Sequence, residues 1–125
     1  MYTYDQRSGL FLKPSGDVLT TGYSGRGLGR NNPIYQNVRT VGPAPRGYCK
    51  ILPGVQHEKL GPIAMQLVYL QADGTVLKLL NARTEFFIHG DNAANDASHG
   101  CIIANRTARE YINTNLEIDS LLEIV

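Results

Sequence analysis

Apolar and polar residues alternate with a period of two along most of the chain, and glycine and proline interrupt this alternation at short intervals. Because a period of two puts successive side chains on opposite faces of a strand, the pattern predicts a mainly β protein. Stretches rich in turn-forming residues separate the runs, notably 7–9, 14–17 and 72–74. The expected strands are residues 2–4, 10–13, 18–23, 47–52, 63–71, 75–80, 86–89, 101–103 and 121–125.

Helical periodicity replaces the alternation in one segment near the C-terminus. Residues from about 106 to 113 carry an apolar stripe of Ala108, Tyr111 and Ile112. Asn105 stands immediately before them as a candidate N-cap. The sequence therefore predicts one short helix in this segment.

No regular period is sustained between residues 24 and 46, where three prolines and several polar or glycine-rich clusters occur. A loop of this length inside a compact domain is usually functional. We interpret the segment as a lid or a substrate wall, and a solvated connection is the alternative interpretation.

Length and charge indicate an ordinary compact protein. A chain of 125 residues suits one domain with a core that needs no disulfide or metal, since such domains bury roughly two thirds of their unfolded surface. The net charge of +1 and the scattered charged residues argue against nucleic acid or a membrane surface as a partner. No apolar run approaches the roughly 20 residues of a membrane span, and the first residues lack the pattern of a Sec-type signal peptide.

Two short motifs carry the candidate chemistry. His89 follows the apolar run 86–88, and Cys101 stands directly behind Gly100. A thiol with its usual pKa near about 8.5 is a poor nucleophile at neutral pH, and a neighbouring imidazole is the common way to activate it. The motifs predict Cys101 as the nucleophile and His89, rather than His99, as its base.

The residues around Cys101 suggest how the site could be built. Gly100 can adopt backbone conformations that other residues avoid, so its N–H and that of Cys101 are candidates for an oxyanion hole. Ser98 can be a turn residue or can position substrate, and the sequence leaves both open.

Two further residues are given structural interpretations. Cys49 lies on an expected strand, and a disulfide with Cys101 would consume the nucleophile, so we expect a half-buried thiol. His57 lies in a polar segment and is expected to be solvated.

These motifs resemble a known family. His-Gly-Asp-Asn at 89–92 followed by Ser-His-Gly-Cys-Ile at 98–102 resembles the signature of the L,D-transpeptidase (YkuD-type) catalytic domain, and Pro-Arg-Gly-Tyr-Cys-Lys-Ile at 45–51 is similar to an earlier strand of those domains. The resemblance runs from Tyr4 to Val125 and implies one YkuD-like β-sandwich or barrel domain with one or two short helices. The chain also resembles the small L,D-transpeptidase-like effectors of type VI secretion systems, at segments 21–25, 31–33, 36–39, 41–43 and 100–103.

The resemblance implies a cysteine enzyme that modifies peptidoglycan. Cys101 would attack the amide between the third stem residue, usually diaminopimelate, and D-alanine, while His89 would take the thiol proton and later protonate the leaving amine. Gly90 stands where the backbone carbonyl orients the imidazole in that family. No cofactor and no metal are implied. The candidate substrate contacts are Ser98, His99, Asn92 and Arg46.

One position departs from the broader family. Most of those enzymes have an arginine two residues after the cysteine, whereas this chain has Ile103. The injected effectors also have an apolar residue at this position. A missing guanidinium removes one contact to a carboxylate or to backbone, which Arg39 or Arg46 could replace from the loop. We expect cleavage or D-amino-acid exchange rather than cross-linking.

The resemblance also implies a biological setting. We expect an antibacterial effector that is exported without a cleavable signal and acts in the periplasm of a target bacterium. Its expected partners are peptidoglycan stem peptides, a periplasmic immunity protein and a spike or tube component of the secretion system.

Four alternatives remain open from the sequence. A housekeeping L,D-transpeptidase would form 3-3 cross-links with the same residues. A zinc hydrolase could use His89, Asp91, His99 and Cys101 as ligands. A papain-like peptidase would normally have its cysteine before its histidine, the reverse of the order here. A cell-wall binding module would need neither Cys101 nor His89.

Overall fold

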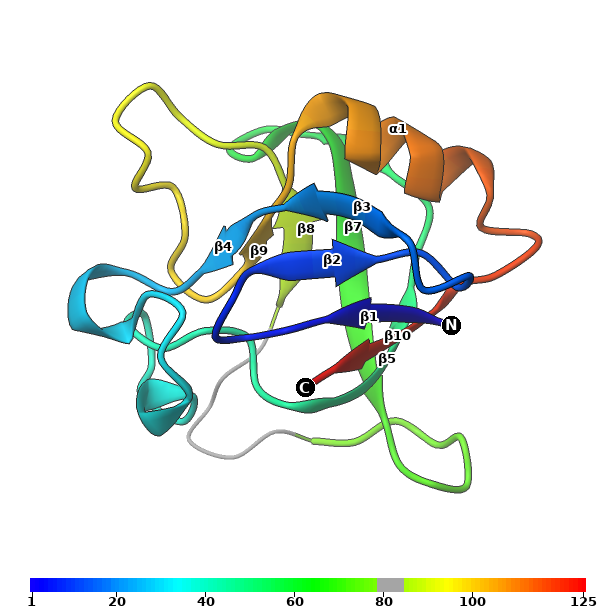
Figure 1. The fold of residues 1–125 in the computed structure, drawn as a ribbon, viewed down its shortest axis with the longest axis horizontal. Helices are drawn as coiled ribbons and strands as arrows, with labels where there is room; N and C mark the ends of the chain where they lie inside the picture. Colours follow the sequence, from blue (N-terminus) through cyan, green and yellow to red (C-terminus); the bar gives the residue numbers. More distant parts are fainter. Residues whose placement is uncertain (79–84) are drawn as a thin grey trace.

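A computed structural model describes residues 1–78 and 85–125 and shows a mainly β protein, as predicted (Figure 1). These residues contain one α-helix, α1 (Arg106–Thr114), and two short 3-10 turns, η1 (Gly27–Gly29) and η2 (Pro33–Tyr35). The strands are β1 (Tyr2–Tyr4), β2 (Leu10–Leu12), β3 (Val18–Thr21), β4 (Tyr23–Ser24), β5 (Gly47–Ile51), β6 (Val55–His57), β7 (Gly61–Leu70), β8 (Phe87–His89), β9 (Ile102–Ile103) and β10 (Leu121–Ile124).

The ten strands of the described part of the chain belong to one mixed sheet. Its order is β3-β2-β1-β10-β5-β7-β8-β9-β4, with β6 paired to β7 off this path. The closing strand β10 inserts between β1 and β5, parallel to the first and antiparallel to the second. β8 and β9 form the other parallel pair, in which Ile88 lies opposite Ile102 and His89 opposite Ile103.

The sheet curls back on itself at Gly22. β3 and β4 stand at opposite ends of the strand order, yet this single residue separates them in the chain. The two ends of the sheet meet at this residue: its N–H donates to the backbone oxygen of Gly9, just before β2 (2.8 Å), and a Cβ atom on it would lie only 1.9 Å from the backbone oxygen of Ile103 in β9. The single strand expected over 18–23 is therefore wrong: the chain changes pairing partner at Gly22.

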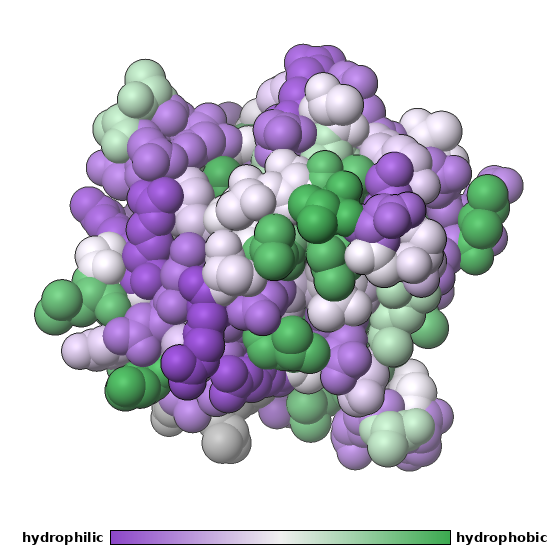
Figure 2. Space-filling model, in the orientation of Figure 1, coloured by the Kyte–Doolittle hydropathy of each residue, from purple (hydrophilic) through white to green (hydrophobic). Residues whose placement is uncertain are grey.

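The core fills the space inside this curled sheet. α1 packs against β7, and its N-cap is the expected Asn105, whose side chain accepts a hydrogen bond of 2.8 Å from the Ala108 N–H. On the face shown in Figure 2, exposed apolar side chains form separate groups among polar ones. The large apolar and aromatic side chains with less than 2% of their surface exposed are Tyr2, Tyr4, Phe11, Ile51, Met65, Ile88, Ile102, Ile112, Leu122 and Ile124.

The buried face of α1 differs from the predicted stripe. Ala108 and Ile112 are buried as expected, but Tyr111 is 37% exposed and lies under the ammonium group of Lys13. The third buried residue of the helix is Arg109. The prediction failed here because it assumed that only apolar residues face the core.

Two strand predictions need correction. Of the strand expected over 75–80, residues 75–78 form a single bridge, between Leu70 and Val76, rather than a strand, and residues 79–80 lie outside the described residues. β6 was not predicted, because its residues are largely exposed and lack a clear alternation. It is formed by antiparallel pairing with β7.

His57 and Cys49 also differ from expectation. His57 is partly buried, and its Nδ1 accepts hydrogen bonds from the backbone N–H groups of Lys59 and Leu60. Its ring meets Phe87 edge-on, with 5.3 Å between centroids. Cys49 is fully buried rather than half-buried.

The substitution Gly22→Ala should destabilise the fold by about 3 kcal/mol, because the new Cβ must push the Ile103 carbonyl away. Urea unfolding of the purified protein measures this change. Gly16→Ala is the control: no atom lies within 4 Å of its Cβ, and only the strain of its positive φ, about 1 kcal/mol, is expected. Equal losses in the two variants would contradict the close approach at Gly22.

Candidate active site

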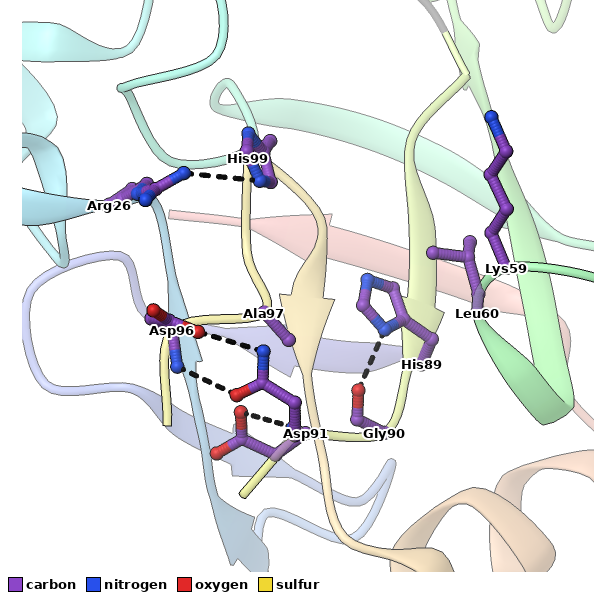
Figure 3. A pocket seen from close by; sticks show the side chains of 10 residues that line it. Arg26, Lys59, Leu60, His89, Gly90, Asp91, Asp96, Ala97 and His99 are labelled. Atoms are coloured by element: carbon purple, nitrogen blue, oxygen red, sulfur yellow. Dashed lines mark hydrogen bonds between the residues drawn. The ribbon is translucent and has the colours of Figure 1, made fainter. Parts of the chain in front are cut away.

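His89 is the last residue of β8 and is almost fully buried, with 3% of its surface exposed. Its Nδ1 lies 2.8 Å from the backbone oxygen of Gly90 (Figure 3). Because a carbonyl oxygen can only accept, this contact places the proton on Nδ1 and leaves the Nε2 lone pair available. An imidazole in this tautomer is arranged to take a proton at Nε2.

The electrostatic surroundings keep His89 neutral. Burial is the main cause that lowers the pKa of His89 below 6.5, and the Arg109 guanidinium and His57 lower it further. The hydrogen bond to Gly90 and the Asp91 carboxylate act in the opposite direction. At pH 7 the imidazole is therefore unprotonated, which is the form that a base requires.

Cys101 comes immediately before β9, which runs parallel to β8. This pairing brings the thiol to the strand that carries His89: the backbone N–H of Phe87 donates to the Cys101 Sγ across 3.3 Å. Cys101 is also partly exposed, whereas burial of the Cys49 thiol raises its pKa to about 12.

Ser98 holds the turn in front of the cysteine. Its fully buried Oγ accepts from the N–H groups of Gly25 (2.9 Å) and Gly100 (3.2 Å) and donates to the carbonyl oxygen of Cys101 (2.6 Å). Gly100 adopts φ +128°, a conformation that favours glycine. Since the Gly100 N–H is engaged with Ser98, an oxyanion hole could use it only by breaking that bond. Ser98 thus acts within the turn in this structure.

A second buried hydroxyl, that of Ser24, ties the segment 24–46 to the same turn. Its Oγ donates to the backbone oxygen of Gly100 (3.1 Å) and accepts from the N–H of Ala44 (2.8 Å). The segment is also packed closely on itself, because a Cβ at Gly29 would lie 2.1 Å from the backbone oxygen of Val41. Of the two functional interpretations, this geometry favours a wall over a lid.

The loop between His89 and Cys101 is fastened to β4 by residues that the sequence did not single out. The Tyr23 hydroxyl donates to Asp91 (2.6 Å) and accepts from the Ala97 N–H (3.0 Å). Arg30 lies over the Tyr23 ring, 3.7 Å from its centroid, and donates to the backbone oxygen of Asn95. The signal that could have revealed this cluster is a tyrosine at a buried strand position, since a buried phenol needs a hydrogen-bond partner.

A pocket of about 300 Å³ opens beside the imidazole. In Figure 3, Arg26 and His99 lie on one side of His89, and Lys59 and Leu60 on the other. The residues that line it are Arg26, Lys59, Leu60, His89, Gly90, Asp91, Asn92, Asp96, Ala97 and His99.

The structure brings some predicted contacts to this pocket and not others. His99 is exposed there, with its Nε2 3.4 Å from Arg26 Nη1, and Asn92 exchanges hydrogen bonds with Asp96 across the loop. Arg46 is exposed and does not line the pocket. Arg26 and Lys59 do, and nothing in the local sequence distinguished them from other basic residues.

Ile103 occupies the position of the arginine that the broader family has. Its side chain is 3% exposed, and the residue pairs with Tyr23 of β4 and His89 of β8. A guanidinium at this position would be buried within the sheet. The positive charge in the pocket beside His89 therefore comes from residues on other elements, not from position 103.

The described residues offer no metal site of the usual kind. Within residues 1–78 and 85–125, no group of three His, Cys, Asp or Glu side chains is arranged to hold a metal ion. The zinc-hydrolase alternative, with His89, Asp91, His99 and Cys101 as ligands, thus finds no ligand set there. No helix in the same part of the chain is both long and apolar enough to span a membrane.

In a comparison with protein families, the model of the Tlde1 domain matches residues 19–125. The chain belongs to the Tlde1 domain family. Tlde1 domains are L,D-transpeptidase-like effector domains of type VI secretion systems that act on peptidoglycan. No curated protein and no solved structure matches this Tlde1 domain.

Within this Tlde1 domain, Ser98→Ala should lower the free energy of unfolding by about 3 kcal/mol, because two buried N–H groups lose their acceptor. Chemical denaturation measures the effect. The control Ser15→Ala removes an exposed serine and should change stability by less than about 0.5 kcal/mol. A Ser98→Ala variant as stable as the wild type would show that the turn does not depend on this hydroxyl.

Proposed function

We propose that residues 1–125 form one catalytic domain that cleaves stem tetrapeptides of peptidoglycan between diaminopimelate and D-alanine. The reaction is L,D-carboxypeptidation when water resolves the intermediate and D-amino-acid exchange when a free D-amino acid does. The observation that carries the proposal is an imidazole whose Nδ1 is fixed by the Gly90 carbonyl, on the strand whose Phe87 N–H contacts the Cys101 thiol.

The first half-reaction forms a thioester. His89 Nε2 takes the proton of the Cys101 thiol as Sγ attacks the carbonyl carbon of diaminopimelate, giving a tetrahedral oxyanion. The C–N bond then breaks, and the imidazolium gives its proton to the departing amine of D-alanine. The product of this step is an acyl-enzyme and free D-alanine.

The second half-reaction releases the stem. A water molecule or the amine of a D-amino acid loses a proton to His89 and attacks the thioester carbonyl, and Cys101 leaves as the thiol. Hydrolysis shortens the stem to a tripeptide, and exchange replaces its last residue. Either product lacks the D-alanine that later cross-linking needs, which accounts for toxicity in a target cell.

Two cations, Arg26 and Lys59, and two carboxylates, Asp91 and Asp96, line the pocket, and the cations can meet the carboxylates of a stem peptide. We assign Arg26 and Lys59 to its carboxylates, because both line the pocket that contains His89. His99 and Asn92 flank the same space and are candidate contacts. Arg46 lies outside it, so Arg26 takes the role first considered for Arg46.

The buried Ile103 favours cleavage and exchange over the 3-3 cross-linking of a housekeeping enzyme. With no guanidinium at this position, the site has one fixed contact fewer for positioning a second stem. We further propose delivery into the periplasm of a target bacterium without a cleavable signal, and two protein partners: a spike or tube component and a periplasmic immunity protein.

Purified disaccharide tetrapeptide, with and without D-methionine, tests the proposed reaction by mass spectrometry. The wild type should release D-alanine and, with D-methionine, form the exchanged stem. Cys101→Ala should lose at least about a thousandfold in rate and His89→Gln at least about a hundredfold, because the nucleophile and its base are removed. Iodoacetamide should label Cys101 and spare the buried Cys49.

Cys49→Ala is the matched control and should retain activity within about twofold, since Cys49 lies in the core away from the pocket. Full activity in Cys101→Ala would exclude the mechanism. Binding to peptidoglycan without turnover by the wild type would instead favour a non-catalytic wall-binding module.

The pocket charge is tested by Arg26→Gln. We expect kcat/KM for the tetrapeptide to fall about tenfold, because a charge-assisted contact to a carboxylate is lost. Arg39→Gln removes an equal charge from an exposed position outside the pocket and should change kcat/KM less than twofold. Equal effects of the two substitutions would show that Arg26 acts only through the net charge of the protein.

A further inference from the structure

Arg109 is a buried cation that the proposed chemistry leaves unused. It lies in α1 and is 6% exposed, facing the core between Ala108 and Ile112. Burying a guanidinium is costly unless its N–H groups find acceptors. The two ion pairs of the described residues, Met1 with Asp119 and Arg106 with Glu110, do not include it.

The guanidinium is satisfied by backbone carbonyls around His89. Arg109 Nε donates to the oxygen of Ala104 (2.9 Å), just after β9, while Nη1 donates to Pro62 and to Ile63 (3.4 Å) in β7. Ile63 has φ +54°, which is rare for a β-branched residue and marks strain that the surroundings must maintain. A strained backbone thus presents two successive carbonyls to one side chain.

The same guanidinium lies against Gly90. A Cβ atom at Gly90 would be 2.8 Å from Arg109 Nη2, so a larger residue would have to displace either the guanidinium or the turn. Ala104 completes the connection: its N–H donates to the backbone oxygen of His89 (3.0 Å), and its own oxygen accepts from Arg109. The turn that carries His89 and Gly90 is therefore enclosed by α1, β7 and the end of β9.

We propose that Arg109 is a positioning residue for the base: its guanidinium holds Gly90 so that the Gly90 carbonyl keeps His89 in the Nδ1–H tautomer. This inference rests on the proposed role of His89. The charged groups that face His89 are Arg109 from α1, His57 from β6 and Asp91 from the loop after β8. Loss of the Arg109 cation removes one of the two neighbours that disfavour protonation of the imidazole.

The test compares Arg109→Met and Arg109→Lys with Arg106→Met, an exposed arginine of the same helix. Nitrogen-15 NMR of the histidines reports tautomer and titration without any substrate. In the wild type, His89 should be protonated on Nδ1 and titrate below pH 6.5. In Arg109→Met, we expect mixed tautomers and a midpoint higher by about one pH unit.

Turnover of the tetrapeptide gives a second readout. For Arg109→Met, kcat should fall about 10- to 100-fold with little change in KM, and the acidic limb of the pH profile should move upward with the NMR midpoint. Arg109→Lys should keep the midpoint near that of the wild type while losing kcat, since an ammonium retains the charge but not the planar donor set. Arg106→Met should match the wild type in every measurement.

Gly90→Ala covers the case in which Arg109→Met does not fold. This substitution moves the turn at residue 90 away from the Arg109 guanidinium but leaves Arg109 in place, so it should give the same mixture of tautomers. An unchanged tautomer and midpoint in either folded variant would overturn the inference. A wild type that releases no D-alanine would refute the proposed function instead, because the NMR signature does not depend on turnover.

Discussion

The parallel pairing of β8 with β9 is the constraint on which the site depends. It sets His89 opposite Ile103 and so brings Cys101, one residue before β9, to the level of Phe87. Parallel neighbours require a crossover connection, which is usually built around a helix. Here residues 90–101 make the crossover without one. A connection with no internal hydrogen-bond ladder must be held from outside, and this requirement explains the polar contacts that it receives from Tyr23, Ser24, Gly25 and Arg30.

These contacts show that the long irregular segment 24–46 has a structural role. Its first residue, Ser24, pairs with β9, and the buried Ser24 and Gly25 bind the turn before Cys101. The segment that looked like a loop is thus part of the support of the nucleophile, and the same segment brings Arg26 to the pocket wall. A substitution in it can therefore affect both the position of the thiol and the charge that substrate meets.

Local patterns were sufficient for the elements and residues whose roles are local. Alternation identified most strands, an N-cap identified α1, and two short motifs identified His89 and Cys101. The failures have one physical origin, which is that partners distant in sequence decided the outcome. Gly22 divides a strand because two sheet ends meet there, and β6 exists because β7 offers an edge. Arg26 and Arg109 are ordinary basic residues until the fold places them beside His89.

Cys49 and Cys101, together with Ile103 and Arg109, show how the fold determines which groups can react. Cys49 and Cys101 have the same side chain, but burial raises the pKa of one thiol to about 12, while the other receives an N–H and is partly exposed. Ile103 is an apolar residue buried in the sheet where the wider family has a cation, and Arg109 is a cation buried on the core-facing side of α1, with Ala108 and Ile112. A cation beside the thiol would act on substrate and thiolate directly. The Arg109 cation packs against Gly90 and can act only through the His89 imidazole. In this protein the buried positive charge therefore affects the base rather than the nucleophile.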